Sequence, residues 1–309
     1  MKNYLVFDGG GTFTKYALMD ENAVILEKDK VPTPGFADHT KEDYYKVLDG
    51  IVEKYKDQIS GIAISMPGML DSIRGYAITA GFLNYLANSP VADELSLRYG
   101  VPVTIENDGK CAALAELWKG SLKGCTNGAV VVLGTGVAGG LVIDGKLYRG
   151  TRFTAGEYSY TCINDRNRMI LDSYWGLCGG AQGLAKAVAN YTGKNWEEYD
   201  GIEIFRLANA GDEEVLKGLK DFTDALSTQI YNLNVLLDLD VIAIGGGISQ
   251  QPLLHQYLKE SLEELIVNHP IRMIAPYIPT PNITNCRYYN DANLIGALYH
   301  FMKLKGELA

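Results

Sequence analysis

The chain has 309 residues, of which 47% are hydrophobic and 21% charged, which is typical of a globular protein with room for two domains. Acidic residues outnumber basic ones by 37 to 28, and the formal net charge of −9 disfavours a nucleic-acid partner, which needs a positive field. The scattered cysteines form no CxxC pair, the N-terminus has no signal-peptide pattern, and no apolar run approaches the roughly 20 residues of a membrane span. We therefore expect a cytoplasmic protein with reduced thiols and no membrane partner.

The first predicted strand, residues 3–8, runs directly into Asp8-Gly9-Gly10-Gly11-Thr12, and Lys15 follows. A carboxylate at a strand end beside three glycines suits Mg²⁺ and phosphate, because backbone N–H groups without a neighbouring Cβ can approach oxyanions closely. Many tight turns also use Gly-Gly, so this loop alone is a weak signal.

Strands and helices alternate through the rest of the first half. Strands are predicted at 14–20, 23–30, 59–66 and 101–105, and helices at 41–56, 91–99 and 108–118, with Thr40 as an N-cap. The segment Ile105-Glu106-Asn107-Asp108 places polar residues where a strand ends and a helix begins. Ligands of α/β folds bind at the carboxyl ends of strands. Asn107 or Asp108 could simply cap the helix, or a carboxylate there could act as a general base, and both roles are compatible.

The same order of strands restarts near Gly128, with strands predicted at 129–133, 139–143 and 146–148. At one constant offset Gly10 corresponds to Gly134, in the loop Gly134-Thr135-Gly136, and Asp20 corresponds to Asp144. Further helices are predicted at 173–191, 202–210, 213–237, 251–266 and 291–303, and further strands at 240–244 and 284–288. The repeat predicts an α/β fold of two duplicated domains with a central cleft. The smaller domain would span 1–118, with a C-terminal helix at 290–305 packing back on it, and the larger domain 119–289.

Two more loops carry candidate chemistry. Ala155-Gly156-Glu157-Tyr158-Ser159-Tyr160 is rich in groups that hydrogen-bond sugar hydroxyls, although such a stretch is more often a surface loop. Gly245-Gly246-Gly247 follows a buried strand and could admit a base or ribose against the backbone. A plain strand-to-helix turn would not usually need three glycines.

These loops, in this order, resemble the ROK family (repressors, open reading frames and kinases) of the actin-like and hexokinase-like ATPase superfamily, whose domains are ribonuclease-H-like. The resemblance covers essentially the whole chain. Asp8 to Thr12 is similar to the first phosphate loop of that family, Glu106-Asn107-Asp108 to its catalytic motif, and Gly134-Thr135-Gly136 to its second phosphate loop. Gly156-Glu157 is similar to the sugar-binding turn and Gly245-Gly246-Gly247 to the adenosine-side loop.

The resemblance implies an ATP-dependent sugar kinase that needs Mg²⁺. Asp108 would take the proton from the sugar hydroxyl, and Asp8 would lie near the Mg²⁺ bound with ATP. The implied sugar-binding residues are Asn107, Glu157, Gly68 and Tyr160. The implied ATP-binding residues are Asp8, Gly10, Gly11, Thr12, Lys15, Gly134, Thr135, Gly136, Gly246 and Gly247. Phosphoryl transfer to an alcohol needs positioning, charge neutralisation and one base, which agrees with the absence of a Cys or Ser nucleophile motif.

The chain departs from the family pattern at the sugar-binding turn. Family sugar kinases commonly have GExGH, whose His binds zinc; here that position is Tyr160, and Cys178-Gly179-Gly180 is only a fragment of the cysteine-rich zinc motif. We therefore expect no structural zinc, and expect His300, in the last helix, to be a packing residue. A Tyr-ended turn and the tail Asn290 to Phe301 resemble the β-glucoside kinases, which phosphorylate the 6-hydroxyl of the non-reducing glucose of cellobiose. Glucokinase, fructokinase and N-acetylmannosamine kinase remain alternatives.

Other functions are weaker hypotheses. Repressors of the family carry a helix-turn-helix domain before the first phosphate loop, whereas only seven residues precede Asp8 here. A sugar-sensing regulator without a DNA-binding domain would have little reason to retain Asp108 and both phosphate loops, and a simple ATPase would lack sugar-dependent turnover. The family often forms dimers through the larger domain, so a homodimer is compatible with this chain, although no segment requires one.

Overall fold

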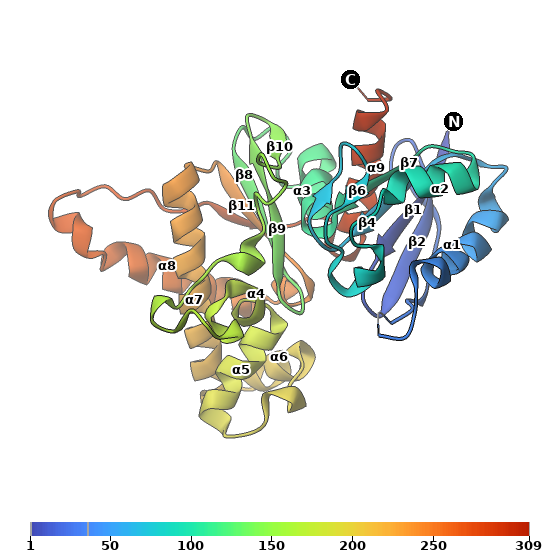
Figure 1. Cartoon of the computed structure of the whole chain (residues 1–309). Coiled ribbons are helices and arrows are strands. Elements are labelled where there is room, and N and C mark those ends of the chain that lie inside the picture. The colour runs from blue at the N-terminus through green and yellow to red at the C-terminus, as the bar shows by residue number, and fades with distance from the viewer. Residues whose placement is uncertain (1, 36, 309) are drawn as a thin grey trace. The chain divides into compact units, whose positions relative to one another are not determined.

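The computed structural model describes residues 2–35 and 37–308. The chain divides into two compact units, coloured by residue number in Figure 1. The first unit comprises residues 2–35, 37–120, 147–155 and 291–308, and the second comprises 121–146 and 156–290.

The first unit is built on a five-stranded sheet in the order β3-β2-β1-β4-β7. Its strands are β1 (Asn3–Gly9), β2 (Phe13–Asp20), β3 (Ile25–Pro32), β4 (Ile59–Met66) and β7 (Val103–Asn107). β1 runs antiparallel to β2 and parallel to β4, and β4 runs parallel to β7. β1 and β4 are buried over most of their length, as expected for parallel strands that are covered on both faces.

Four α-helices accompany this sheet: α1 (Lys41–Tyr55), α2 (Val91–Tyr99), α3 (Asp108–Lys119) and α9 (Ala292–Leu304). Thr40 is the N-cap of α1, as the sequence predicts, and the structure adds a capping box with Asp43. α9 packs along α3 and against β4, β1 and β7, and the rings of Tyr4 and Phe301 meet at 5.3 Å between centroids. Residues 291–308 therefore share the core of the N-terminal half.

Two short features of the first unit have no counterpart in the sequence prediction. A two-stranded hairpin pairs β5 (Leu70–Asp71) with β6 (Tyr76–Ala77), and a 3₁₀ helix covers Gly81–Leu86. Both elements are too short for hydrophobic periodicity to reveal them. The turn of the hairpin carries Ser72, which contacts the end of β7.

The second unit repeats the sheet of the first. Its order is β10-β9-β8-β11-β12, the same order of equivalent strands. The strands are β8 (Gly128–Leu133), β9 (Val137–Ile143), β10 (Lys146–Tyr148), β11 (Val241–Gly245) and β12 (Ile283–Asn285). Within it β8 is antiparallel to β9 and parallel to β11. The predicted duplicated α/β fold is confirmed.

Helices α5 (Ala181–Thr192), α6 (Gly201–Asn209), α7 (Glu213–Leu237) and α8 (Pro252–Val267) form most of the remaining core of the second unit. The prediction of one helix at 173–191 is wrong, because the short helix α4 (Trp175–Cys178) ends at Gly179 and α5 starts after Gly180. The strand predicted at 284–288 is limited to β12. None of the helices in the described part of the chain combines the length and apolar character needed to cross a lipid bilayer.

Candidate active site

In the first unit, polar side chains gather at the carboxyl ends of the parallel strands. The register pairs Asp8 of β1 with Ser65 of β4, and Ser65 with Glu106 of β7. Parallel strands end at the same edge of a sheet, so the loops that follow β1, β4 and β7 all leave from this edge. This edge of the sheet carries four residues of the predicted site: Asp8, Gly68, Asn107 and Asp108.

Asp8 is held at this edge by partners on three elements. Its Oδ1 accepts hydrogen bonds from Ser65 Oγ at 3.1 Å and from Asn293 Nδ2 at 3.0 Å. Its Oδ2 lies 3.6 Å from the Nζ of Lys15, its cross-strand partner on β2. Asp8 is 7% exposed. Asn293, from α9, was missed by the sequence reasoning, which used the tail around it only as a mark of resemblance.

The loop after β1 is accessible although the strand before it is buried. Gly10 is half-buried, Gly11 and Thr12 are exposed, and the N–H of Gly10 donates to the carbonyl of Phe13 at 3.1 Å, which closes the turn. An acidic oxygen beside an open glycine turn and a lysine fits Mg²⁺ together with phosphate, because Mg²⁺ prefers carboxylate and phosphate oxygens.

Asn107 and Asp108 lie at the junction of β7 and α3. Asn107 is the N-cap of α3: its Oδ1 accepts from the N–H of Lys110 at 3.0 Å, and its Nδ2 donates to the carbonyl of Gly68 at 3.0 Å. Asp108 is the first residue of the helix and is half-buried. Of the two capping alternatives, the structure selects Asn107, which leaves the Asp108 carboxylate at a helix N-terminus, where a negative charge is stabilised.

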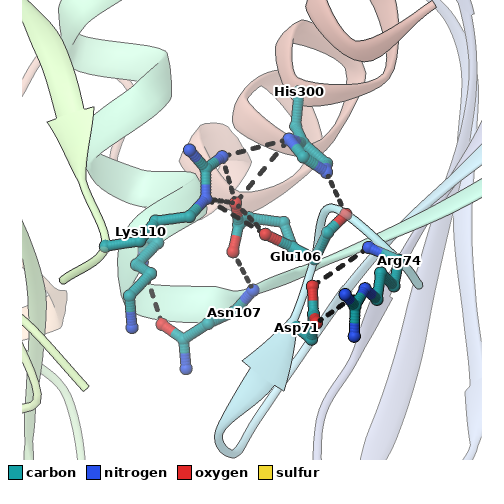
Figure 2. A network of polar contacts seen from close by, with 8 residues as sticks. Asp71, Arg74, Glu106, Asn107, Lys110 and His300 are labelled. Atoms are coloured by element: carbon teal, nitrogen blue, oxygen red, sulfur yellow. Dashed lines mark hydrogen bonds and ion pairs between the residues drawn. The ribbon is translucent and has the colours of Figure 1, made fainter. Parts of the chain in front are cut away.

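Glu106, the first residue of the predicted motif, makes a different set of contacts. It is 1% exposed, and its Oε2 accepts from Arg149 Nε at 2.9 Å and from Ser72 Oγ at 3.0 Å. Figure 2 shows Glu106 between Asn107 and His300. Burial alone would raise the pKa of Glu106, but the positive charge that His300 gains once it is protonated in acid, the Arg149 guanidinium and the Asn107 N–H outweigh it and lower the pKa. His300 is therefore not a plain packing residue: it lies 3.6 Å from this carboxylate.

In the second unit, the loop Gly134-Thr135-Gly136 follows β8 and packs on the start of α5. The N–H groups of Ala181 and Gln182 donate to the carbonyls of Gly134, at 2.8 Å, and of Thr135, at 3.2 Å. The loop thus provides caps for a helix that has no side-chain cap. A Cβ on Gly180 would lie 2.3 Å from the Gly136 carbonyl. Gly180, in the fragment of the zinc motif, is therefore a point of close contact with this loop.

The predicted adenosine-side loop lies beside the same loop. β8 and β11 are parallel neighbours, so Gly134 and Gly246 follow adjacent strand ends. Gly246 has a positive φ of 93°, and a Cβ there would lie 2.2 Å from the Leu133 carbonyl. Gly247 is exposed. The structure therefore brings the two predicted nucleotide-binding loops of this unit together.

The turn with Glu157 and Tyr160 is anchored by Tyr158. Tyr158 is buried, its hydroxyl donates to the Gly140 carbonyl at 3.3 Å, and its ring lies 5.4 Å from that of Trp175. Glu157, which precedes this anchor, is half-buried. Tyr160 is 61% exposed.

Two of the cysteines, Cys162 and Cys178, engage backbone carbonyls near this turn. Cys162 Sγ donates to the Asn164 carbonyl at 3.5 Å, and Cys178 Sγ to the Asp172 carbonyl at 2.8 Å. Burial raises the pKa of the Cys178 thiol, which favours the protonated form. Within residues 2–35 and 37–308, no three His, Cys, Asp or Glu side chains gather closely enough to hold a metal ion.

Comparison with known proteins gives consistent matches over nearly the full length. The model of the ROK family matches residues 4–303. A β-glucoside kinase of Klebsiella pneumoniae is 30% identical, covering 96% of this chain and 95% of its own. An N-acetyl-D-glucosamine kinase of Photobacterium profundum is 29% identical, covering 86% and 90%. The crystal structure of a ROK family protein from Streptococcus pneumoniae in complex with sucrose superposes with a TM-score of 0.86 at 29% identity, covering 99% and 100%.

Proposed function

The chain belongs to the ROK family, and we propose that it transfers the γ-phosphoryl group of ATP to the 6-hydroxyl of a glucose unit, with β-glucosides such as cellobiose as its acceptors. Kinase-named relatives of nearly full length support the sugar kinase activity. The observation that carries the chemistry is the half-buried Asp108 at the start of α3, next to its N-cap Asn107.

Asp108 is proposed as the general base. It accepts the proton of the 6-hydroxyl while the bond between that oxygen and the γ-phosphorus forms and the bond to the ADP oxygen breaks. The amide of Asn107 retains one N–H and one lone pair beyond its bonds to Gly68 and Lys110, and these would bind ring hydroxyls. Glu157, Tyr160 and Gly68 complete the proposed sugar-binding residues.

The remaining site residues are proposed to bind the nucleotide. Asp8 would hold Mg²⁺, which supplies charge neutralisation for the phosphates when bound. Gly10, Gly11, Thr12 and Lys15 would bind phosphate oxygens. Gly134, Thr135, Gly136, Gly246 and Gly247 are also proposed as nucleotide-binding residues. The accessibility of the loop after β1 and the common strand edge of the loops after β8 and β11 support these assignments.

The β-glucoside acceptor is the most specific part of the proposal. Tyr160 stands where family sugar kinases commonly have a zinc-binding His, and its high exposure leaves room for a substituent beside it. The Streptococcus pneumoniae relative binds a disaccharide, sucrose. A substituent on C1 that meets only solvent changes binding energy little, so discrimination between cellobiose and glucose should be modest.

Rates on a panel of sugars test the acceptor. We expect cellobiose or an aryl β-glucoside to show a kcat/KM at least comparable to that of glucose, measured with Mg-ATP under one set of conditions. The panel should include N-acetylglucosamine, N-acetylmannosamine and fructose, and ATP hydrolysis without sugar is the control. Activity on a monosaccharide with none on any β-glucoside would contradict the acceptor and leave a hexose kinase; no sugar-dependent transfer would contradict the kinase itself.

The metal requirement is a separate prediction. We expect the purified protein to contain no stoichiometric zinc, because Tyr160 replaces the zinc-binding His and the cysteine cluster is missing. EDTA should abolish activity by removing Mg²⁺, and added Mg²⁺ alone should restore it. Elemental analysis that finds one zinc per chain would contradict this expectation.

A further inference from the structure

The buried carboxylate of Glu106 is the meeting point of three segments that are far apart in the sequence. Ser72 comes from the turn of the β5–β6 hairpin, Arg149 from the segment 147–155, and His300 from α9. Asp71 holds the hairpin turn, since its Oδ1 accepts from the N–H of Arg74 at 3.0 Å. Figure 2 shows this turn beside Glu106 and His300.

The two carboxylate oxygens of Glu106 have different hydrogen-bond partners. Oε2 accepts from Ser72 Oγ and from both the Nε and Nη2 of Arg149. Oε1 accepts from the backbone N–H of Asn107 at 2.9 Å. Arg149 thus binds one carboxylate oxygen through the Nε and Nη2 side of its guanidinium, and the other oxygen holds the peptide that joins Glu106 to Asn107.

His300 orients Arg149 through one defined tautomer. Its Nε2 lies 3.2 Å from the Ser72 carbonyl, which can only accept, so Nε2 carries the proton. Nδ1 then accepts from Arg149 Nη2 at 3.2 Å. Burial lowers the pKa of His300, against the opposing effect of Glu106, and Arg149 lowers it further. The ring is therefore neutral at pH 7, and the group carries one negative and one positive charge.

This arrangement fixes Asn107 at both its backbone and its side chain. Its N–H is held by Glu106, its Oδ1 by the N–H of Lys110, and its Nδ2 by the Gly68 carbonyl. Asp108 follows immediately, so the direction of its carboxylate depends on the orientation of that peptide. Catalysis by a positioned base is sensitive to this direction, because a displacement of about 1 Å can cost about 10²-fold in rate.

We propose that Ser72, Glu106, Arg149 and His300 form a positioning network that holds the Asn107 peptide and thereby aims Asp108 at the acceptor hydroxyl. The inference rests on the proposed kinase function and deepens it. Glu106, at 1% exposure, acts in this proposal as a positioning residue, through Asn107. A buried ion pair is by itself weak grounds for stability, since apolar residues of similar volume often replace one without loss. An apolar pair, however, could not bond the Asn107 N–H.

Kinetics of Glu106→Gln, His300→Gln and His300→Phe test the proposal in the full-length protein. Glu106→Gln keeps the side-chain size but loses the charge that holds Arg149, and we expect kcat to fall about 10–100-fold with KM values for sugar and ATP nearly unchanged. His300→Phe removes both polar contacts of the ring and should lower kcat in the same way. His300→Gln, which can still donate to Ser72 or accept from Arg149, should recover much of that loss.

A second readout follows the peptide directly. Amide hydrogen exchange over residues 103–112 should be faster in Glu106→Gln and His300→Phe than in the wild type. Arg98→Met is the matched control: it removes an arginine that pairs with Glu42 and Asp49 in the same unit, and it should leave both kcat and this exchange unchanged.

The outcomes separate the two proposals. A wild type that transfers phosphate to a sugar, with folded Glu106→Gln and His300→Phe variants of unchanged kcat and unchanged exchange, would overturn the positioning network alone. Parallel losses in kcat and in both binding constants would also overturn it, as a general structural defect. A wild type that transfers to no sugar would overturn the kinase function and the catalytic meaning of the network with it.

Discussion

Replacement of Asp108 by asparagine is expected to lower kcat by about 10²–10⁴-fold, the usual effect of losing a general base, while sugar and ATP still bind. Asparagine has the same shape, and its Oδ1 can still accept from the N–H of Gly109, which the aspartate does at 2.8 Å. The start of α3 should therefore remain intact. Only the capacity to take up the proton of the acceptor hydroxyl is lost.

The measurement is single-turnover transfer from ATP together with calorimetric titration of each ligand. Asp43→Asn is the matched control, because Asp43 also lies in the first turn of a helix of the same unit, α1, and has no proposed role in the reaction. Its kcat should match that of the wild type. A folded Asp108→Asn protein with near-normal turnover would exclude the base role, and one that binds neither ligand would assign Asp108 to binding.

Repetition made the fold predictable from the sequence. The correspondence of Gly10 with Gly134 reflects two sheets with the same strand order. Local signals also located α1, whose Thr40 cap and apolar spacing lie within a single stretch of chain. The break between α4 and α5 was missed because its cause is tertiary: the approach of Gly180 to the Gly136 carbonyl cannot be inferred from the residues around 173–191.

The candidate site was predictable where its residues follow strands, and not where distant segments meet. Ser72 and His300 lie 34 and 194 positions from Glu106, and nothing near either one indicates the other. One signal was available: a glutamate at the end of an apolar strand will be buried, and a buried charge requires a partner. That rule predicts a cation for Glu106 but does not identify Arg149. The roles assigned to the loop residues remain predictions.

The network around Glu106 also predicts how stability depends on pH. The pKa of Glu106 is lowered from its usual 4.5, so its contribution is present above that pH and is lost as pH falls through the folded value. The pKa of His300 is lowered from 6.5. As pH falls below 6.5, His300 is therefore protonated in the unfolded chain before it is protonated in the folded chain, and this favours unfolding. Both groups make the wild type less stable on acidification.

Arg149→Met should destabilise the protein by about 3–5 kcal/mol near pH 8, the usual cost of leaving one partner of a buried ion pair alone. Without the guanidinium, burial should raise the pKa of Glu106. The free energy needed to bury the neutral carboxylic acid is smaller than that needed to bury the unpaired carboxylate. His300, 3.6 Å away, should also gain a proton more readily beside the unpaired carboxylate. Both changes favour the folded variant in acid, so its deficit relative to the wild type should shrink as pH falls.

Denaturant unfolding of the wild type, Arg149→Met and the control Arg98→Met at pH 8, 6.5 and 5 measures this deficit. Arg98 pairs with the more exposed carboxylates of Glu42 and Asp49, and its loss should cost about 0–1 kcal/mol. Adding His300→Gln to Arg149→Met removes the imidazole ring that takes up a proton. The double variant should therefore keep a larger stability deficit at pH 6.5 than Arg149→Met alone. A deficit for Arg149→Met that is equally large at all three pH values would show that the variant loses packing alone, and that the unpaired Glu106 charge does not govern its stability.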